Sequence, residues 1–126
     1  MTKNKSATRY ASQTQEERVS SLLGGRRNSN SGAGHFDKSD VVVDRASLSV
    51  ECKTCMTPKD SFSIKKEWFE KSKEEAFANR LENHAIAFNF FFEDKEDYYI
   101  IDGKLMAFLT EKLSEEYSWQ KTVTMI

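Results

Sequence analysis

The sequence predicts an α/β fold, a mixed β-sheet flanked by helices with its elements in the order α-β-β-α-β-β-α. Three observations predict this fold class. Two short runs rich in β-branched residues lie close together in the first half, a segment with helical periodicity follows them, and two further extended runs precede a last helical segment. The length of 126 residues is that of one domain with a single core.

The first helix is predicted over about residues 12–23. A hydroxyl residue at its start can cap it, and a Gly-Gly pair at its end can stop it. Its apolar stripe consists of Val19, Leu22 and Leu23. Residues 1–11 are polar and basic, so we expect them to form a flexible arm and residues 12–126 to form one domain.

The later elements alternate between extended and helical patterns. In order, we expect strands over residues 41–43 and 48–50, a helix over about 64–81, strands over 85–92 and 98–101, and a helix over 105–113. The apolar side of the middle helix consists of Trp68, Phe69, Ala76 and Phe77. We expect Phe88, Phe90 and Phe92 to share one strand face. This face forms part of the core or, if no element covers it, part of a dimer interface. Residues 117–126 are ambiguous.

An acidic residue and an E-x-K triplet lie at the ends of the first two strands. Asp40 precedes the first strand, and Glu51-Cys52-Lys53 closes the second. Because side chains alternate along a strand, Glu51 and Lys53 share a face. An antiparallel pairing of the two strands, through a two-residue loop or the more favourable four-residue loop 44–47, places Asp40 directly across from Glu51.

This arrangement suits a hard divalent cation. Two neighbouring carboxylates repel each other unless positive charge lies between them. Mg²⁺ and Mn²⁺ are commonly bound by one or two carboxylates together with waters and a substrate phosphate. Lys53 can position or activate a water molecule and offset negative charge on a phosphorane. The D-x(10)-E-x-K pattern alone also fits solvated charges at strand ends, so its placement on neighbouring strands is what favours a site.

Residues 12–80 resemble the PD-(D/E)XK nucleases, and within them the small Holliday junction resolvase-like proteins of archaea, bacteria and phages. Ser39 stands where the superfamily name has proline. The runs that carry the resemblance are Ser31-Gly32-Ala33, Lys38-Ser39-Asp40-Val41, Glu51-Cys52-Lys53 and the stretch from Ser61 to Trp68.

The resemblance implies a restriction-endonuclease-like fold and a metal-dependent DNA endonuclease that acts by direct attack of water, preferably on branched DNA. It implies that Asp40 and Glu51 bind Mg²⁺, with Mn²⁺ as a substitute, and that Lys53 is catalytic. It also implies an acidic residue from the first helix, best matched by Glu16 and otherwise by Glu17. Symmetric cleavage of two strands implies a homodimer.

Basic and hydroxyl residues near this site are candidates for DNA binding. Residues 1–80 hold 15 Lys and Arg against 11 Asp and Glu, and residues 81–126 hold 4 against 9, which suggests that one face meets a polyanion. Loop residues can grip phosphates with side chains and amides, and the resemblance adds two lysines of the middle helix. The candidates are Arg26, Arg27, Asn28, Ser29, Ser31, Lys38, Lys65 and Lys66.

Three alternatives stay open. The first is a restriction, repair or nicking nuclease with the same core, and the second is a DNA-binding module without catalysis. The third is a zinc-dependent interaction domain that uses Cys52 and Cys55, for which His35 and His84 are the only histidines. Because the sequence has no apolar run near 20 residues and no signal-peptide pattern, we expect a cytoplasmic protein without a membrane partner.

Overall fold

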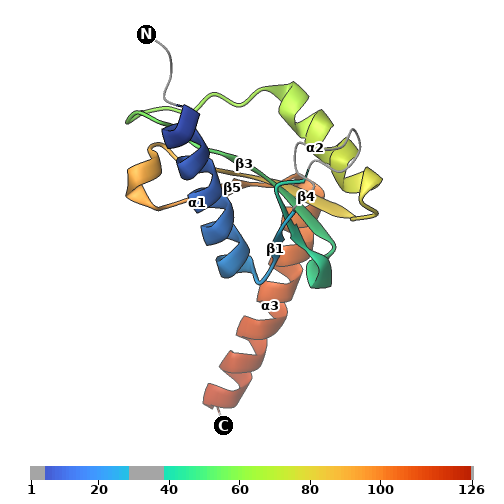
Figure 1. The fold of residues 1–126 in the computed structure, drawn as a ribbon. Helices are drawn as coiled ribbons and strands as arrows, with labels where there is room; N and C mark the ends of the chain where they lie inside the picture. Colours follow the sequence, from blue (N-terminus) through green and yellow to red (C-terminus); the bar gives the residue numbers. More distant parts are fainter. Residues whose placement is uncertain (1–4, 29–38, 126) are drawn as a thin grey trace.

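The computed structural model describes residues 5–28 and 39–125, with side chains described for residues 6–28 and 39–120. The fold is α/β, with a five-stranded mixed sheet and three α-helices (Figure 1). The helices are α1 (Lys5–Leu23), α2 (Lys66–Ala78) and α3 (Gly103–Met125). The strands, in their order across the sheet, are β1 (Arg26–Arg27), β2 (Val41–Val43), β3 (Leu48–Lys53), β4 (Asn83–Phe88) and β5 (Tyr98–Ile100).

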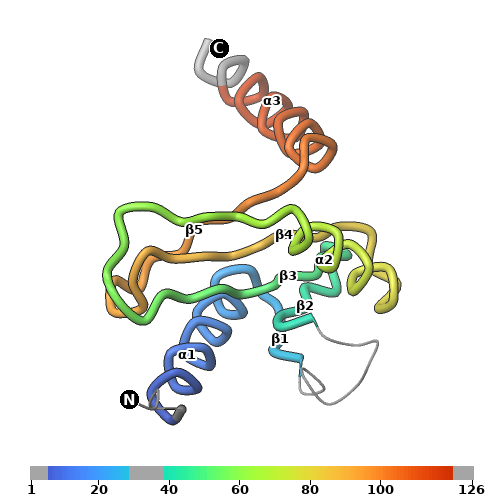
Figure 2. Tube along the Cα trace, turned by 90° about the horizontal axis from the view of Figure 1, so that it is seen from above, coloured from blue at the N-terminus to red at the C-terminus, as the bar shows by residue number. Residues whose placement is uncertain are grey.

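Helix α1 lies on one face of the sheet, α2 lies on the other, and α3 extends away from the sheet (Figures 1 and 2). The buried core lies between α1 and the sheet. Its members are Val19, Val41, Val43, Val50, Ala85 and Ala87. Alternation along β3 turns Val50 toward α1, so Glu51 faces the side of the sheet that α2 covers. None of the helices in residues 5–28 and 39–125 has the length and apolar character of a membrane span.

Helix α1 begins at Lys5, so residues 5–11, which we expected in a flexible arm, are helical. The reason is that the buried side of α1 starts at Ala11, which is 2% exposed, and continues at intervals of four through Gln15 and Val19. This spacing runs on to Leu23 and leaves Leu22, predicted in the apolar stripe, 70% exposed. The helix ends before Gly24, whose φ of +68° is the left-handed conformation that glycine adopts at little cost.

The β2–β3 hairpin has the register that the sequence predicts. Val41 pairs with Val50 and Val43 pairs with Leu48, in antiparallel orientation. The connection over residues 44–47 is one turn of 3₁₀ helix closed by Ser47. The prediction of a four-residue loop is therefore confirmed.

Strand β1 is a difference from the sequence prediction, which placed Arg26 and Arg27 in a loop. Arg26 pairs with Val42 and Arg27 with Val41, antiparallel, at the edge of the sheet. The pairing depends on Gly25, because a Cβ atom there would lie 2.7 Å from the carbonyl oxygen of Val42. Two arginines carry no apolar alternation, so sequence periodicity gave no signal for this strand.

Helix α2 connects β3 to the parallel strand β4, with Leu48 paired to Asn83 and Lys53 to Phe88. It is shorter than predicted. It buries Ala76 but leaves Phe77 84% exposed, so the placement of Phe77 in the core was wrong. The buried side of the helix instead carries two polar residues.

Strands β4 and β5 form the predicted antiparallel hairpin, with Phe88 paired to Tyr98. Because β4 ends at Phe88, Phe90 and Phe92 lie beyond the strand, and the three rings do not share one strand face as predicted. Helix α3 is longer than predicted and includes the tail that the sequence left ambiguous as far as Met125.

Candidate functional site

The hairpin register brings Asp40 next to the end of β3. The Oδ2 atom of Asp40 accepts a 2.8 Å hydrogen bond from the backbone N–H of Cys52. On its other side, the backbone carbonyl of Asp40 accepts a 3.0 Å bond from the N–H of Asn28. Asp40 is therefore held between the chain that leaves β1 and the strand that carries Glu51 and Lys53.

Glu51 and Lys53 project from the same face of β3 into a groove beneath α2. Lys53 Nζ lies 3.2 Å from Glu51 Oε1 and 4.5 Å from the centroid of the Trp68 ring. The groove has a volume of about 590 Å³, and its lining consists of Trp68, two lysines and four acids: Lys53, Lys71, Glu51, Glu67, Glu70 and Glu74. The face of an aromatic ring attracts a cation, so Trp68 favours the charged amine at this position.

One oxygen of Glu51 has no hydrogen-bond partner among the described residues. This atom, Oε2, is buried, whereas Oε1 faces Lys53. A buried carboxylate oxygen left in this state is costly, so buried polar atoms normally have a partner. Glu51 Oε2 is thus a buried acceptor that a cation or water could use.

Glu16 on α1 is a second acid close to Asp40, on the face of the sheet opposite the groove that holds Glu51. Burial raises the pKa of Glu16, the nearby Asp40 carboxylate raises it further, and Arg27 lowers it. The side chain of Glu16 is 15% exposed, whereas that of Glu17 is 66% exposed, and Arg27 lies 3.5 Å from each. Of the two acids proposed from the sequence, Glu16 is the one that interacts electrostatically with Asp40.

The carboxylate oxygens of Asp40 and Glu51 are of the kind that a hard divalent cation prefers. Asp40 and Glu51 supply carboxylate oxygens, and Mg²⁺ needs only one or two carboxylates because waters and substrate complete its shell. Within the described ranges, no three His, Cys, Asp or Glu side chains are arranged as a complete ligand group. The pKa of the Cys52 thiol is raised by burial first and then by the carboxylates of Asp40 and Glu16, so the thiol stays neutral.

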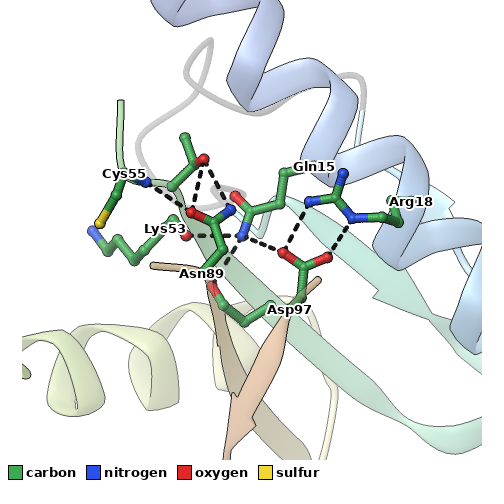
Figure 3. A network of polar contacts seen from close by, with 8 residues as sticks. Gln15, Arg18, Lys53, Cys55, Asn89 and Asp97 are labelled. Carbon is green, nitrogen blue, oxygen red and sulfur yellow. Dashed lines mark hydrogen bonds and ion pairs between the residues drawn. The ribbon is translucent and has the colours of Figure 1, made fainter. Parts of the chain in front are cut away.

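A buried polar network joins α1 to the end of β3 (Figure 3). Gln15 Nε2 donates to the carbonyl of Lys53 at 2.8 Å and to Asp97 Oδ1 at 3.2 Å. Arg18 makes a two-point contact with Asp97, with distances of 2.6 and 3.0 Å. The network fixes the backbone of Lys53 and the helix that carries Glu16.

The loop after β3 is held by Asn89, which is fully buried (Figure 3). Asn89 Oδ1 accepts a 2.9 Å bond from the backbone N–H of Cys55, and Asn89 Nδ2 donates to Thr54 Oγ1 at 2.9 Å. Sequence analysis singled out neither Asn89 nor Gln15. The one available signal was that Gln15 occupies a helix position between Ala11 and Val19, at the spacing of the buried face.

The predicted DNA-binding residues fall into three groups. Arg26 and Arg27 are exposed and pair with acids, Arg26 with Asp44 at 2.8 Å. Asn28 is 6% exposed. Lys65 and Lys66 are exposed at the start of α2, and Lys66 lies 3.9 Å from Glu70. Three further candidates lie outside the described residues: Ser29, Ser31 and Lys38.

The residues of the zinc alternative are not gathered by the described part of the chain. Cys52 and Cys55 are free thiols and half-buried. His84 lies on β4 opposite Ser49, near the start of β3, while Cys52 lies near its end. His35 is outside the described residues.

Comparison of the chain with protein-family models, with curated proteins and with solved structures found no match. A functional proposal therefore rests on the residues and on their geometry.

Proposed function

We propose that the protein is a divalent-metal-dependent DNA endonuclease of the PD-(D/E)XK type. The observations that carry the proposal are the bond that holds Asp40 against the end of β3, the contact between Glu51 and Lys53 on that strand, and the buried Glu51 Oε2, which has no hydrogen-bond partner among the described residues. The topology supports it too. The sheet is mixed and has helices on both of its faces, which is compatible with the fold that the resemblance implies, although β1 adds a strand to the order expected from the sequence.

The acids of the site would hold the metal. Asp40 and Glu51 are the proposed ligands, and Glu16 completes the acidic site from α1. Mg²⁺ or Mn²⁺, when bound, would polarise the scissile phosphodiester and lower the pKa of a bound water. Without a metal, burial and the Asp40 carboxylate raise the pKa of Glu16. A cation bound nearby would favour the charged carboxylate and so lower this pKa.

Lys53 is the proposed catalytic residue. Its amine donates hydrogen bonds to the attacking water or to a phosphate oxygen and offsets the negative charge that develops on the phosphorus. Glu51 and the Trp68 ring hold the amine in place, and Gln15 fixes the backbone of Lys53 from the other face of the sheet. Water attacks phosphorus directly and no covalent enzyme intermediate forms.

DNA reaches the site past exposed basic side chains. Lys71 of α2 lines the groove, Lys65 and Lys66 are exposed at the start of α2, and Arg26 and Arg27 are exposed on the edge strand β1. Such contacts neutralise phosphates and position the duplex without reading its sequence. Branched DNA as the substrate, a homodimer as the active form and a cytoplasmic location are carried over from the sequence as parts of the proposal.

A cleavage assay on structured DNA tests the proposal. Wild-type protein is incubated with a four-way junction, a flap and a linear duplex of the same sequence, with Mg²⁺ or with EDTA. We expect cleavage with Mg²⁺ alone, and preference for the junction if the resolvase-like assignment is right. Preference for linear duplex or flap DNA would favour a restriction or repair nuclease instead.

The matched variants are E51Q and E17Q. Each variant removes one carboxylate charge. Glu51 lies on β3 in the groove, whereas Glu17 lies on α1, is 66% exposed and is outside the groove. We expect E51Q to bind junction DNA and not to cleave it, and E17Q to behave as wild type. A wild-type protein that binds DNA but never cuts with Mg²⁺ or Mn²⁺ is the result expected of a binding module, and it would overturn the nuclease.

Mg²⁺ should also stabilise the fold without any DNA. A ligand that binds only the folded state stabilises it by about 2.7 kcal/mol at one hundred times its dissociation constant. We expect the melting temperature of the wild type to rise with Mg²⁺ concentration and that of E51Q to rise much less. Because no DNA is present, the shift in melting temperature tests the metal site even if four-way junctions are not the substrate.

A further inference from the structure

Helix α3 leaves most of its apolar side chains in solvent. After its first turns it extends away from the body and has no extensive contact with another element in the described part of the chain (Figures 1 and 2). The exposed large hydrophobic residues of α3 are Met106, Phe108, Leu109, Leu113, Tyr117 and Trp119, with exposures from 42% to 64%. An apolar surface of this extent marks an interaction site.

An apolar groove lies at the base of the same helix. Its volume is about 570 Å³, and it is formed by the end of α1, the near end of the sheet and the first turns of α3. The apolar side chains that line it include Leu23, Leu48, Tyr99, Ile101, Leu105 and Phe108. One chain therefore carries both an unfilled apolar groove and an uncovered apolar helix.

We propose that these two surfaces cover each other in a two-fold symmetric dimer. The two α3 helices pack antiparallel, and the outer half of each helix lies over the groove of the other copy. Such an interface uses the same patch on both subunits, as closed dimers do. Packing against the groove adds buried apolar surface, which a contact between two short helices alone would not provide.

The stripe of α3 that faces the groove sets the register. Successive residues of a helix are rotated by 100°, so residues at suitable spacings share one side of it. One such side of α3, roughly 100° wide, has apolar residues toward both ends of the helix and two opposite charges between them. The stripe consists of Leu105, Phe108, Leu109, Lys112, Glu116 and Trp119, so it holds three of the six exposed apolar residues, while Met106, Leu113 and Tyr117 lie beside it. It extends from the first turns of the helix to the last described side chains.

Charge complementarity identifies the occupant as a second copy. When the two-fold axis lies level with Ser114, each Lys112 is opposite Glu116 of the other copy, and each Trp119 is opposite Leu109 at the groove. A parallel pair would instead place Lys112 against Lys112 and Glu116 against Glu116. The stripe is thus self-complementary in the antiparallel orientation only.

The present partners of these charges do not prevent the exchange. Lys112 lies 3.6 Å from Glu115, and Glu116 accepts a 3.2 Å bond from Gln120, all on the same helix. Lys112 is 58% exposed, and contacts between exposed groups on one helix contribute little. Both side chains are long enough to turn toward a neighbouring helix.

The proposed interface leaves the candidate nuclease site open. Leu48 lines the groove at the start of β3, whereas Lys53 lies at the end of that strand, about 17 Å away at the usual rise. The interface is therefore separate from the candidate site, although the proposed function also includes a homodimer. A monomer that cleaves DNA would overturn the interface alone, and a dimer that does not cleave would overturn the nuclease alone.

A charge-swap experiment on the full chain without DNA tests the dimer. Sedimentation velocity over a range of concentrations gives the dimer dissociation constant for wild type, K112E and E116K. Each single variant places like charges together twice, so we expect its dissociation constant to rise about tenfold or more. An equimolar mixture of the two variants restores opposite charges at both positions, and we expect it to dimerise as well as wild type.

The control is E111K, which makes the same charge change as E116K on the other side of α3. We expect E111K to dimerise as wild type, and circular dichroism to show unchanged helix in every variant. Wild-type protein that stays monomeric at high concentration overturns the proposal, as does a dimer that neither variant weakens. Failure of the mixture to dimerise overturns the antiparallel register.

Discussion

The carboxylate of Asp40 accepts a 2.8 Å hydrogen bond from the backbone N–H of Cys52. The same side chain therefore ties the hairpin together and belongs to the acidic site, and the two roles can be separated. D40N keeps an oxygen acceptor for Cys52 but loses the charge. We expect D40N to change the free energy of unfolding by less than about 1 kcal/mol and to reduce cleavage by about a hundredfold or more.

D40A is the matched comparison, because alanine removes the acceptor as well. We expect D40A to lower the free energy of unfolding by about 1–3 kcal/mol, since the Cys52 amide loses its partner. Urea titration measures stability, and a junction cleavage assay measures activity. Equal activity of D40N and wild type would falsify the assignment of Asp40 to the site.

Glu16 gives a prediction about pH. Burial, followed by repulsion from Asp40, raises the pKa of Glu16 in the folded protein. A raised folded pKa means that the folded state favours the protonated acid. The protonated Glu16 therefore contributes to stability fully below the ordinary pKa of 4.5. This contribution is lost as the pH rises through the pKa that Glu16 has in the folded protein. We therefore expect E16Q to melt at a higher temperature than wild type at pH 7.

The advantage of E16Q should shrink as the pH falls below 4.5, where the wild-type acid is also neutral. E17Q is the control because its side chain is 66% exposed, and we expect little change in melting temperature at either pH. Thermal melts from pH 3.5 to 7.5 measure the effect. A stability gain of E16Q that does not depend on pH would point to packing rather than to charge.

The hairpin was predictable because its information is local. Val41 and Val50 lie nine positions apart, and the β-branched residues between them specify both strands and their register. The position of Asp40 beside β3 followed from that register. Strand β1 was not predictable, because its pairing depends on a close approach by Gly25 and not on any pattern in the two arginines.

The long-range part of the site could not be predicted in the same way. Asp97 follows the turn between β4 and β5, yet it contacts Gln15 and Arg18 on α1. No local pattern pairs residues about eighty positions apart, because the contact exists only after the sheet has formed. Phe77 shows the opposite failure. Its helical spacing indicated burial, but the described chain places no element over that side of α2.

The buried Arg18–Asp97 pair should be a major stabilising contact. Asp97 has a side-chain exposure of 3%, and its loss would leave Arg18 and Gln15 without their shared acceptor. We expect D97A to lower the free energy of unfolding by about 3–5 kcal/mol, the usual cost of removing one partner of a buried pair. A double-mutant cycle with R18A should give a coupling energy of at least about 1 kcal/mol.

The Arg26–Asp44 pair is the matched control for this cycle. Its closest contact is 2.8 Å, but both side chains are more than half exposed. We expect no measurable coupling between R26A and D44A, because solvent screens exposed pairs. Urea unfolding of the four variants in each cycle gives both values. Equal coupling in the two cycles would show that burial does not decide the strength of the Arg18–Asp97 contact.

His84 predicts a loss of stability in weak acid. The side chain is 10% exposed, its Nδ1 atom is buried with no hydrogen-bond partner among the described residues, and Nε2 lies 3.6 Å from Asp102. Burial lowers the pKa of His84 below its ordinary 6.5, Lys73 lowers it further, and Asp102 opposes the shift. Because the folded state favours the neutral imidazole, His84 contributes stability above pH 6.5. This contribution is lost as the pH falls through the pKa that His84 has in the folded protein.

We therefore expect the melting temperature to fall between pH 7.5 and pH 5.5 and the fall to depend on the neighbours of His84. D102N removes the acid that supports the charged imidazole, so the fall should be steeper than in wild type. Asparagine still caps α3 where Asp102 Oδ1 now accepts the N–H of Leu105, so the variant should fold normally at pH 7.5. K73M removes a repelling charge and should make the fall shallower. If D102N and K73M shift the profile in the same direction, charge at His84 does not set the acid limb.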